Sequence, residues 1–314
     1  MFLSMKWISF TLSFSATSIL FILGTFTLTV EAINVDEELL SLFPENTQVI
    51  GFIDVAQLRE NQLAQKLIES ELIGGRFLGR TREEFIRWTG LDVEKGIEQL
   101  MAGHMGSDGF LIILRTNHGT LNPTPYLSER KIYFEEQTGS TLYRTYGQED
   151  WVIALEGKLV FVGSVKIVRD ALSKLTISDR SARDNHLLVD ALKLVEDGNQ
   201  IWSVGEFSTL LPKGISPPMA TELVDSLERG VLQVRIDTNV AANALGYFNN
   251  SDTAARATEL LRGFLGLFKA QTYGHLGLAE LLENITIDTI ESSANIHCII
   301  DGELLRRLSS SLDQ

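Results

Sequence analysis

Two carboxylates occupy matching places in a phrase that the chain contains twice. Asp54 follows the apolar run of TQVIGFIDVAQL (residues 47–58), and Glu206 stands at the same place in NQIWSVGEFSTL (residues 199–210). If a two-fold relation brought these side chains together, one pKa would rise and the pair could supply an acid and a base for hydrolysis. The alternative is that each carboxylate opens the next helix, where the helix dipole favours negative charge. We favour this second interpretation, which needs no catalysis.

Other patterns that could support chemistry match incompletely. Ser128 and Lys131 have the Ser-x-x-Lys spacing of some acyl-transfer enzymes, but the KTG companion motif is absent from the sequence. The run GHMGSDG (residues 103–109) lacks the Lys-Ser/Thr of a phosphate-binding loop, so we interpret it as a hairpin turn. The histidines are never three or four residues apart, and a single cysteine excludes a Cys/His zinc site. We therefore predict no catalytic residue, metal or cofactor.

A long apolar helix offers a different kind of site. Residues 251–270 place Leu261, Phe264 and Phe268 on one broad apolar face. We interpret this face as core that packs across a sheet. The alternative is that, with LGLAELL (residues 276–282), it walls a cavity for a lipid-like ligand, which makes these three residues candidate ligand-binding residues.

The elements that would position these residues recur along the chain. Residues 40–58 align with residues 192–210 without a gap, at a constant offset of 152. Each copy has the pattern of a helix end, a polar turn, a strand and a carboxylate that opens a helix. A second pair of similar segments is VFVGSVKIVRDAL (residues 160–172) and IHCIIDGELLRRL (residues 296–308). Two pairs of similar segments in the same order indicate duplication.

Between these similar segments, predicted strands follow one another as hairpins, and predicted helices separate the hairpins. VLQVRIDT and VAANALGYF (residues 231–248) form one such pair, whereas LDVEKGIEQL (residues 91–100) and ATELVDSLERG (residues 220–230) are predicted as helices. The order predicts an α+β fold with largely antiparallel sheets and helices packed on one face. We expect two tandem, pseudo-equivalent repeats, over residues 36–176 and 182–312.

The net charge limits which partners the chain can bind, and the single cysteine limits its thiol chemistry. The formal net charge of −14 at pH 7 repels phosphate backbones and anionic lipid headgroups, so we predict no nucleic-acid partner. The only cysteine, Cys298, lies in the alternating run NIHCIID (residues 295–301), which is typical of a strand. We predict that it is a buried, inert thiol rather than a nucleophile.

The N-terminus has the layout of an export signal. Lys6 precedes the uncharged residues 7–30, and Val30 and Ala32 place aliphatic or small side chains where a signal peptidase reads them. We predict that residues 1–32 are a cleaved signal peptide and that the protein is periplasmic or extracellular. The alternative is an N-terminal anchor through residues 7–30, which would span roughly 36 Å as a helix and would be the contact with the membrane.

The whole arrangement resembles a known family. The order of LFPENTQVIGFIDVAQL (residues 42–58), TGLDVEKGIEQL (residues 89–100), KLVFVGSVKIVRDALSKL (residues 158–175) and the terminal strand and helix resembles exported bacterial proteins of a two-repeat, domain-of-unknown-function family. The resemblance implies an exported α+β protein with no assigned activity, and it carries over no catalytic residue.

These observations lead to one functional expectation and two alternatives. We expect a non-catalytic exported protein that binds or scaffolds a partner which the sequence does not identify. The first alternative is a carrier of an apolar small molecule or lipid in a sheet–helix cavity. The second is a hydrolase with acidic residues at the seam between the repeats.

Overall fold

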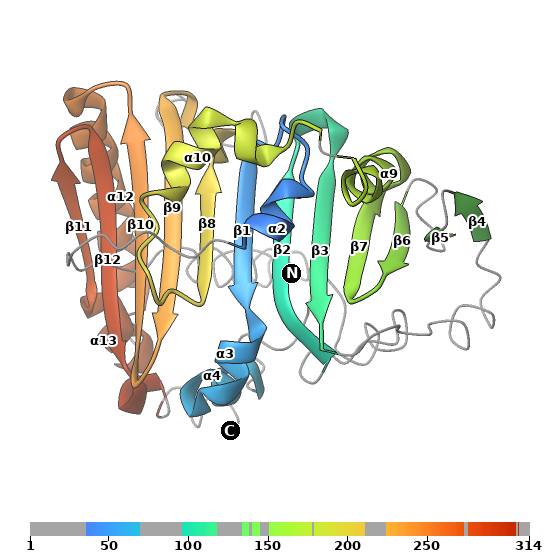
Figure 1. Cartoon of the computed structure of the whole chain (residues 1–314). Coiled ribbons are helices and arrows are strands. Elements are labelled where there is room, and N and C mark those ends of the chain that lie inside the picture. Colours follow the sequence, from blue (N-terminus) through green and yellow to red (C-terminus); the bar gives the residue numbers. More distant parts are fainter. Residues whose placement is uncertain are drawn as a thin grey trace, which may run out of the picture. The chain divides into compact units, whose positions relative to one another are not determined.

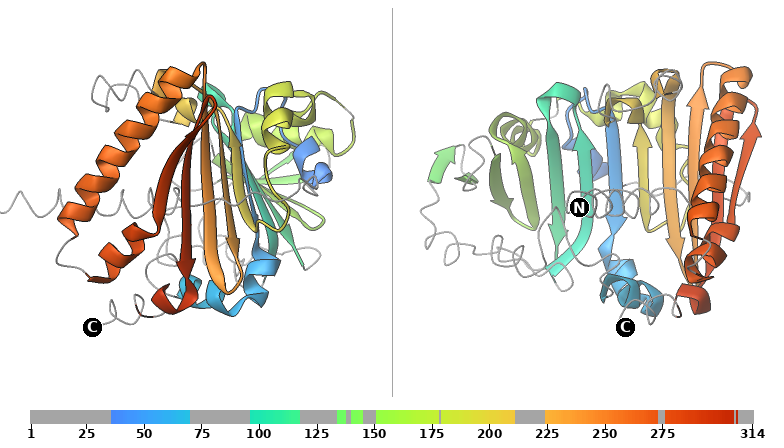
Figure 2. Two further views of the ribbon diagram at one scale, coloured as in Figure 1. Left: turned by 90° about the vertical axis from the view of Figure 1, so that its left-hand side faces the viewer. Right: turned by 180° about the vertical axis from the view of Figure 1, so that it is seen from behind.

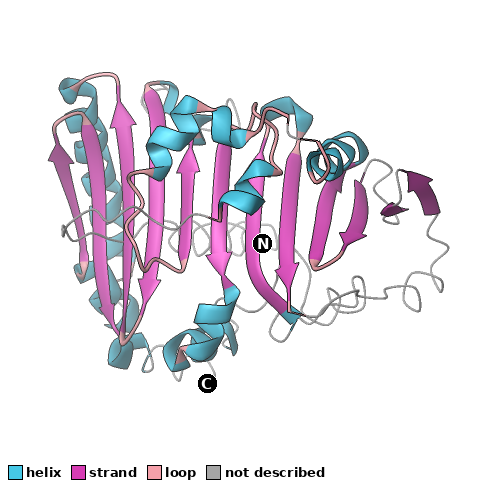
Figure 3. Cartoon of the chain, viewed as in Figure 1, coloured by secondary structure: helices cyan, strands magenta, loops and turns pink. Residues whose placement is uncertain are grey.

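The chain adopts an α+β fold of antiparallel strands with helices packed against them (Figures 1 and 3). The computed structural model describes residues 36–69, 96–117, 134–137, 140–144, 151–177, 179–210, 224–272, 276–305 and 307. The described residues fall into two compact units, residues 36–210 and residues 224–307. The predicted signal peptide, residues 1–32, lies outside the described ranges.

The first unit contains both copies of the repeated phrase. Its described elements are α2 (Glu37–Ser41), β1 (Val49–Asp54), α3 (Val55–Glu60), α4 (Gln62–Glu69), β2 (Ile97–His104), η1 (Gly106–Asp108), β3 (Phe110–Thr116), β4 (Phe134–Gln137), β5 (Ser140–Arg144), β6 (Trp151–Glu156), β7 (Leu159–Ser164), α9 (Val165–Lys174), η2 (Ala182–Asp184), α10 (His186–Leu192), β8 (Ile201–Gly205) and η3 (Phe207–Leu210). Their strands lie in the order β8-β1-β2-β3-β7-β6-β5-β4, and each adjacent pair is antiparallel.

One face of this sheet is covered by α9 and by the chain after α2. Gly103, Leu111 and Gly163 lie side by side in the register of β2, β3 and β7. A Cβ on Gly103 would lie 2.5 Å from the Phe43 ring, and one on Gly163 would lie 2.6 Å from the Phe110 carbonyl oxygen. Gly103 therefore lets Phe43 approach the sheet closely, and Gly163 leaves room for the backbone of β3.

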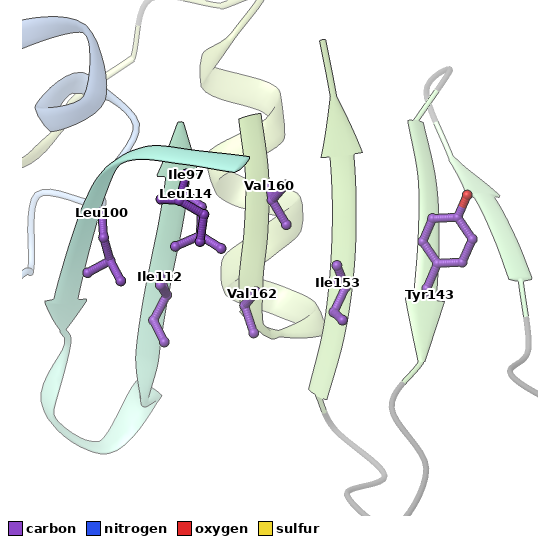
Figure 4. Close-up of a cluster of buried hydrophobic side chains, with 8 residues drawn as sticks. All are labelled: Ile97, Leu100, Ile112, Leu114, Tyr143, Ile153, Val160 and Val162. Atoms are coloured by element: carbon purple, nitrogen blue, oxygen red, sulfur yellow. The ribbon is translucent and has the colours of Figure 1, made fainter. Parts of the chain in front are cut away.

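The other face of the same sheet carries a second buried cluster (Figure 4). Because successive side chains of a strand alternate, β3 contributes Leu111 and Ile113 to one face and Ile112 and Leu114 to the other, and all four are buried. The cluster consists of Ile97, Leu100, Ile112, Leu114, Tyr143, Ile153, Val160 and Val162. A strand buried on both faces explains why residues 111–114, LIIL, are all apolar.

The second unit is a four-stranded arrangement with a long helix, as far as its described residues go. Its elements are β9 (Leu227–Ile236), β10 (Asn239–Phe248), α12 (Ser251–Gln271), α13 (Leu276–Glu283), β11 (Ile285–Ile290) and β12 (Ser293–Asp301), and the strand order is β9-β10-β12-β11. Asn250 is the N-cap of α12, and its side chain accepts a hydrogen bond of 2.8 Å from the Thr253 amide. The helix then packs against β10, β11 and β12.

Two predicted helices are wrong where they overlap strands. Ile97 to Leu100 begin β2 rather than continuing a helix, and β9 begins at Leu227. Ile97 and Leu100 are buried in the cluster of Figure 4, so pairing with distant strands overrides the local helical pattern. The antiparallel, helix-covered α+β class is confirmed, as is the hairpin turn at residues 105–109 between β2 and β3.

Candidate functional site

The two copies of the repeated phrase pair directly with each other. β1 and β8 are antiparallel neighbours, with Gly51 opposite Ser203 at the centre of the pair. These residues are also equivalent in the alignment at offset 152. The Ser203 hydroxyl reinforces the pairing, since it donates a hydrogen bond of 2.9 Å to the Ile50 carbonyl oxygen. The seam between the phrases is thus a strand pair rather than an open cleft.

This register does not bring Asp54 and Glu206 together. The Asp54 amide donates to the carbonyl oxygen of Gln200 at one end of the pair, and the Glu206 amide donates to that of Gln48 at the other. Gln48, which pairs with Glu206, is six positions before Asp54. The main chains of Asp54 and Glu206 are therefore about 20 Å apart along the strands. A carboxylate pair that shares a proton needs contact, and this geometry does not provide it.

Asp54 instead caps a helix. Its Oδ1 accepts a hydrogen bond of 2.9 Å from the Gln57 amide at the start of α3, and its Oδ2 accepts one of 2.9 Å from Gln57 Nε2. Glu206 precedes the 3₁₀ turn η3, where its main-chain oxygen accepts hydrogen bonds from the Thr209 amide and hydroxyl. Both residues therefore stand where a strand turns into a helical segment, as the non-catalytic interpretation predicts.

A polar cavity of about 320 Å³ opens at the Asp54 end of the sheet. Arg115 of β3 lies in it and forms ion pairs of 2.9 Å with Asp36 and with Glu38. Its lining includes Asp36, Asp54, Glu60, Glu98, Gln99 and Arg115. The cavity is rich in carboxylates and would attract cations. Sequence reasoning missed it because its residues come from separate segments, and only the strand register sets Gln99 beside both Asp54 and Arg115.

The remaining polar candidates do not form a reactive site among the described residues. Ser128 and Lys131 lie outside the described ranges. No three His, Cys, Asp or Glu side chains within those ranges gather so that they could hold a metal ion. Cys298 is fully buried in β12, as predicted, and burial raises the pKa of its thiol to about 12.

Helix α12 divides into two halves with different surroundings. Its first half is buried through Thr253, Ala254, Ala257 and Thr258, and Leu261 packs against the cluster that Ala254 and Ala257 form with Phe248 and Ala294. Its second half stands away from the strands, as the left view of Figure 2 shows. The core interpretation therefore holds for the first half and is wrong for the second.

Three apolar side chains of the second half are exposed to solvent. Phe264 is 41 % exposed, Leu267 is 61 % exposed and Phe268 is 40 % exposed. Phe264 and Phe268 continue the stripe that is buried at Ala257 and half-buried at Leu261, because residues three, four, seven and eleven apart share one side of a helix. We call Phe264, Leu267 and Phe268 the α12 patch. Of the sequence-predicted ligand residues, Phe264 and Phe268 belong to it and Leu261 borders it.

Contacts of Arg262 and Lys269 set the rotation of this half of the helix about its own axis. Arg262 Nε donates a hydrogen bond of 2.9 Å to the Ile287 carbonyl oxygen of β11, and its guanidinium also pairs with Glu259 at 2.9 Å. Lys269 pairs with Glu283 of α13 at 3.1 Å. These contacts hold one polar side of α12 against β11 and α13, so the exposure of the α12 patch follows from a fixed orientation.

None of the helices in the described part of the chain is long and apolar enough to cross a membrane. The predicted anchor, residues 7–30, lies outside that part.

Comparison with known proteins identifies a distant structural likeness. No protein-family model matches the sequence, and no curated protein matches it. The structure is similar to crystal form I of TP0453, with 14 % sequence identity and a TM-score of 0.46, over 86 % of this chain and 96 % of that chain.

Proposed function

We propose that this chain is an exported, non-catalytic binding protein and that the α12 patch is its binding surface. The observation that carries the proposal is the exposure of Phe264, Leu267 and Phe268 on a helix whose first half is buried. Full burial of such a side chain is worth about 1.5–3 kcal/mol, so a partner that covers the patch gains affinity without any change in the fold. These three residues lie within five positions of one helix, so their exposed surfaces adjoin rather than being scattered singly.

A second candidate function is a carrier of an apolar small molecule. Leu261, Phe264 and Phe268 follow one stripe of α12, and Leu282 of α13 is buried near the far end of this helix pair. A ligand lying against that stripe would extend the apolar surface that Ala254 and Ala257 already form with the sheet. This alternative uses the sheet-facing residues of α12 and leaves Leu267 outside.

We also propose that the two halves, residues 36–176 and 182–312, are pseudo-equivalent repeats. Two observations support this. Gly51 and Ser203, which are equivalent in sequence, lie opposite each other in the β1–β8 pair. In addition, the hairpins β2–β3 and β6–β7 lie in the order β2-β3-β7-β6, and the hairpins β9–β10 and β11–β12 lie in the corresponding order β9-β10-β12-β11. An experimental structure in which the halves fail to superpose, strand for strand, would refute duplication.

Export is tested through the N-terminus of the mature protein. Expressed with its own N-terminus, the protein should begin at Ile33, within a residue or two, in N-terminal sequencing or intact-mass measurement. A membrane-bound form that still begins at Met1 would favour the anchor through residues 7–30 instead.

The binding proposal is tested by native mass spectrometry of the protein purified from the cell envelope of the organism that produces it. The wild-type chain should carry a co-purified component, and the double variant Phe264→Ser/Phe268→Ser should have lost it. The matched control Ile177→Ser/Leu187→Ser changes two exposed apolar residues of the other unit, and it should retain the component. A wild-type protein that carries nothing, or a double variant that carries the same component, would contradict the proposal.

A further inference from the structure

We propose that the occupant of the α12 patch is the acyl region of a lipid surface, into which the second half of α12 inserts. This inference rests on the proposed binding function and names the chemistry of its partner. It extends the sequence-based expectation, which placed membrane contact in the N-terminal segment alone.

Apolar residues lie almost all the way round the second half of α12. From Leu260 to Ala270 the sequence is LLRGFLGLFKA, in which Arg262 and Lys269 are the only charged residues. At about 100° per residue these two lie about 20° apart, so they occupy one narrow sector. The rest of the circumference carries only apolar side chains and glycines. A helix that is apolar nearly all round belongs in a core or in lipid, and this half is exposed.

A partner that covers only one side of the helix would leave part of this apolar surface in water. Phe268 lies about 100° from Leu267 around the axis, and Gly266 lies about 100° from Leu267 on the other side. A second copy of the chain packing helix against helix, or a small molecule against the stripe, covers one side. An acyl phase contacts every side of the helix that is not held against β11 and α13, so it covers Leu267, which is 61 % exposed, together with Phe264 and Phe268.

The charges beside the patch indicate which kind of lipid it would enter. Arg262 pairs with Glu259 and Asp288, and Lys269 pairs with Glu283, so both cations beside the patch already have carboxylate partners. The chain as a whole carries −14. Attraction to anionic headgroups therefore contributes little, and binding should come from apolar insertion. We expect zwitterionic surfaces to be bound at least as well as anionic ones, with little dependence on salt.

The shape of the helix pair fits this role. In the left view of Figure 2 the C-terminal end of α12 stands away from the strands, and α13 leads back toward them. Arg262 links α12 to β11, and Lys269 links α12 to α13. The apolar residues can then enter the upper acyl region while the sheet stays in water.

The test is flotation of the full mature chain with phosphatidylcholine vesicles. The wild type should float with the vesicles, equally at low and high salt. Phe264→Ser/Phe268→Ser should bind at least tenfold more weakly. Leu267→Ser should also bind more weakly, because lipid contacts the outer side of the helix. The control Ile177→Ser/Leu187→Ser should float like the wild type. All variants should still melt cooperatively, because none of the changed side chains belongs to the buried core.

Several results would overturn the inference. A wild-type chain that stays unbound, or a double variant that floats equally well, excludes insertion through α12. A Leu267→Ser variant that binds normally shows that the ligand covers only the stripe and favours the carrier. A patch-dependent dimer in light scattering, without vesicle binding, assigns the surface to a second copy. If vesicles are not bound but the co-purified component is still lost from the envelope-derived double variant, the binding function stands and the lipid assignment fails.

Discussion

Gly51 and Ser203 lie directly opposite each other in the antiparallel pair of β1 and β8, although 152 positions separate them in the chain. The same two residues correspond when the repeated phrases are aligned, so each phrase meets its own copy in reverse. A slip of one residue would turn every side chain of one strand to the opposite face, which makes this register a strongly specified feature. The stability of the seam is therefore open to direct test.

Gly205 should be the least tolerant position of the seam. Its φ is +133°, and a Cβ there would lie 2.1 Å from the Gln48 carbonyl oxygen. Gly205→Ala combines backbone strain with a steric clash, so it should lower the free energy of unfolding by about 3 kcal/mol or more, measured by denaturant unfolding.

Gly157 provides the matched control. It also has a positive φ, of +58°, but a Cβ there meets nothing within 4 Å. Gly157→Ala should cost only about 1 kcal/mol, the scale of placing an alanine in a left-handed conformation. Equal losses in the two variants would show that backbone strain alone matters and that β8 can move away from β1.

Asp54 and Glu206 should contribute independently. Asp54→Asn and Glu206→Gln should each lower the free energy of unfolding by at most about 1 kcal/mol, the scale of a charge at a helix start. Because the seam separates the two residues, the double variant should equal the sum within about 0.5 kcal/mol. A single substitution that stabilises the fold, with strong coupling in the double variant, would reopen the case for a catalytic pair.

His104 should make the fold sensitive to acid. Its ring contacts Phe110 with 4.9 Å between centroids, and desolvation lowers its pKa below the usual 6.5. The folded protein therefore binds this proton less readily than the unfolded chain. The stability that this provides is fully present above pH 6.5 and falls as the pH drops from 6.5 to the lowered folded pKa. His104→Gln should flatten this part of the stability–pH curve in urea unfolding, and an unchanged curve would refute the assignment.

Cys298 should be unreactive until the protein unfolds. Burial raises the pKa of its thiol to about 12, so the thiolate that attacks alkylating reagents is almost absent at pH 8. Iodoacetamide should label the native protein slowly and the urea-unfolded protein rapidly, as mass spectrometry can follow. Rapid labelling of the native chain would show that β12 opens locally.

The sequence by itself determined the elements whose signals are local. Alternating apolar residues predicted the hairpin β9–β10 and the strand β12, and the buried position of Cys298 followed from the same pattern. The 3.6-residue period predicted α12 over residues 251–270 to within one residue of its observed end. The carboxylate of Asp54 predicted the start of a helix. Each of these features depends on neighbours within a few positions, so a single stretch of sequence contains it.

Only the tertiary structure decided where these elements meet. Residues 97–100 became a strand because they pair with β1 and β3, although their local pattern indicates a helix. Register placed Asp54 and Glu206 at opposite ends of one strand pair, and it set Gln99 beside Arg115 in the polar cavity. The side of α12 that faces the strands is buried through Ala254 and Ala257, whereas Phe264 and Phe268 farther along the helix are exposed. Periodicity specifies which side of a helix is apolar, whereas the angle between the helix and the sheet determines how much of that side is buried.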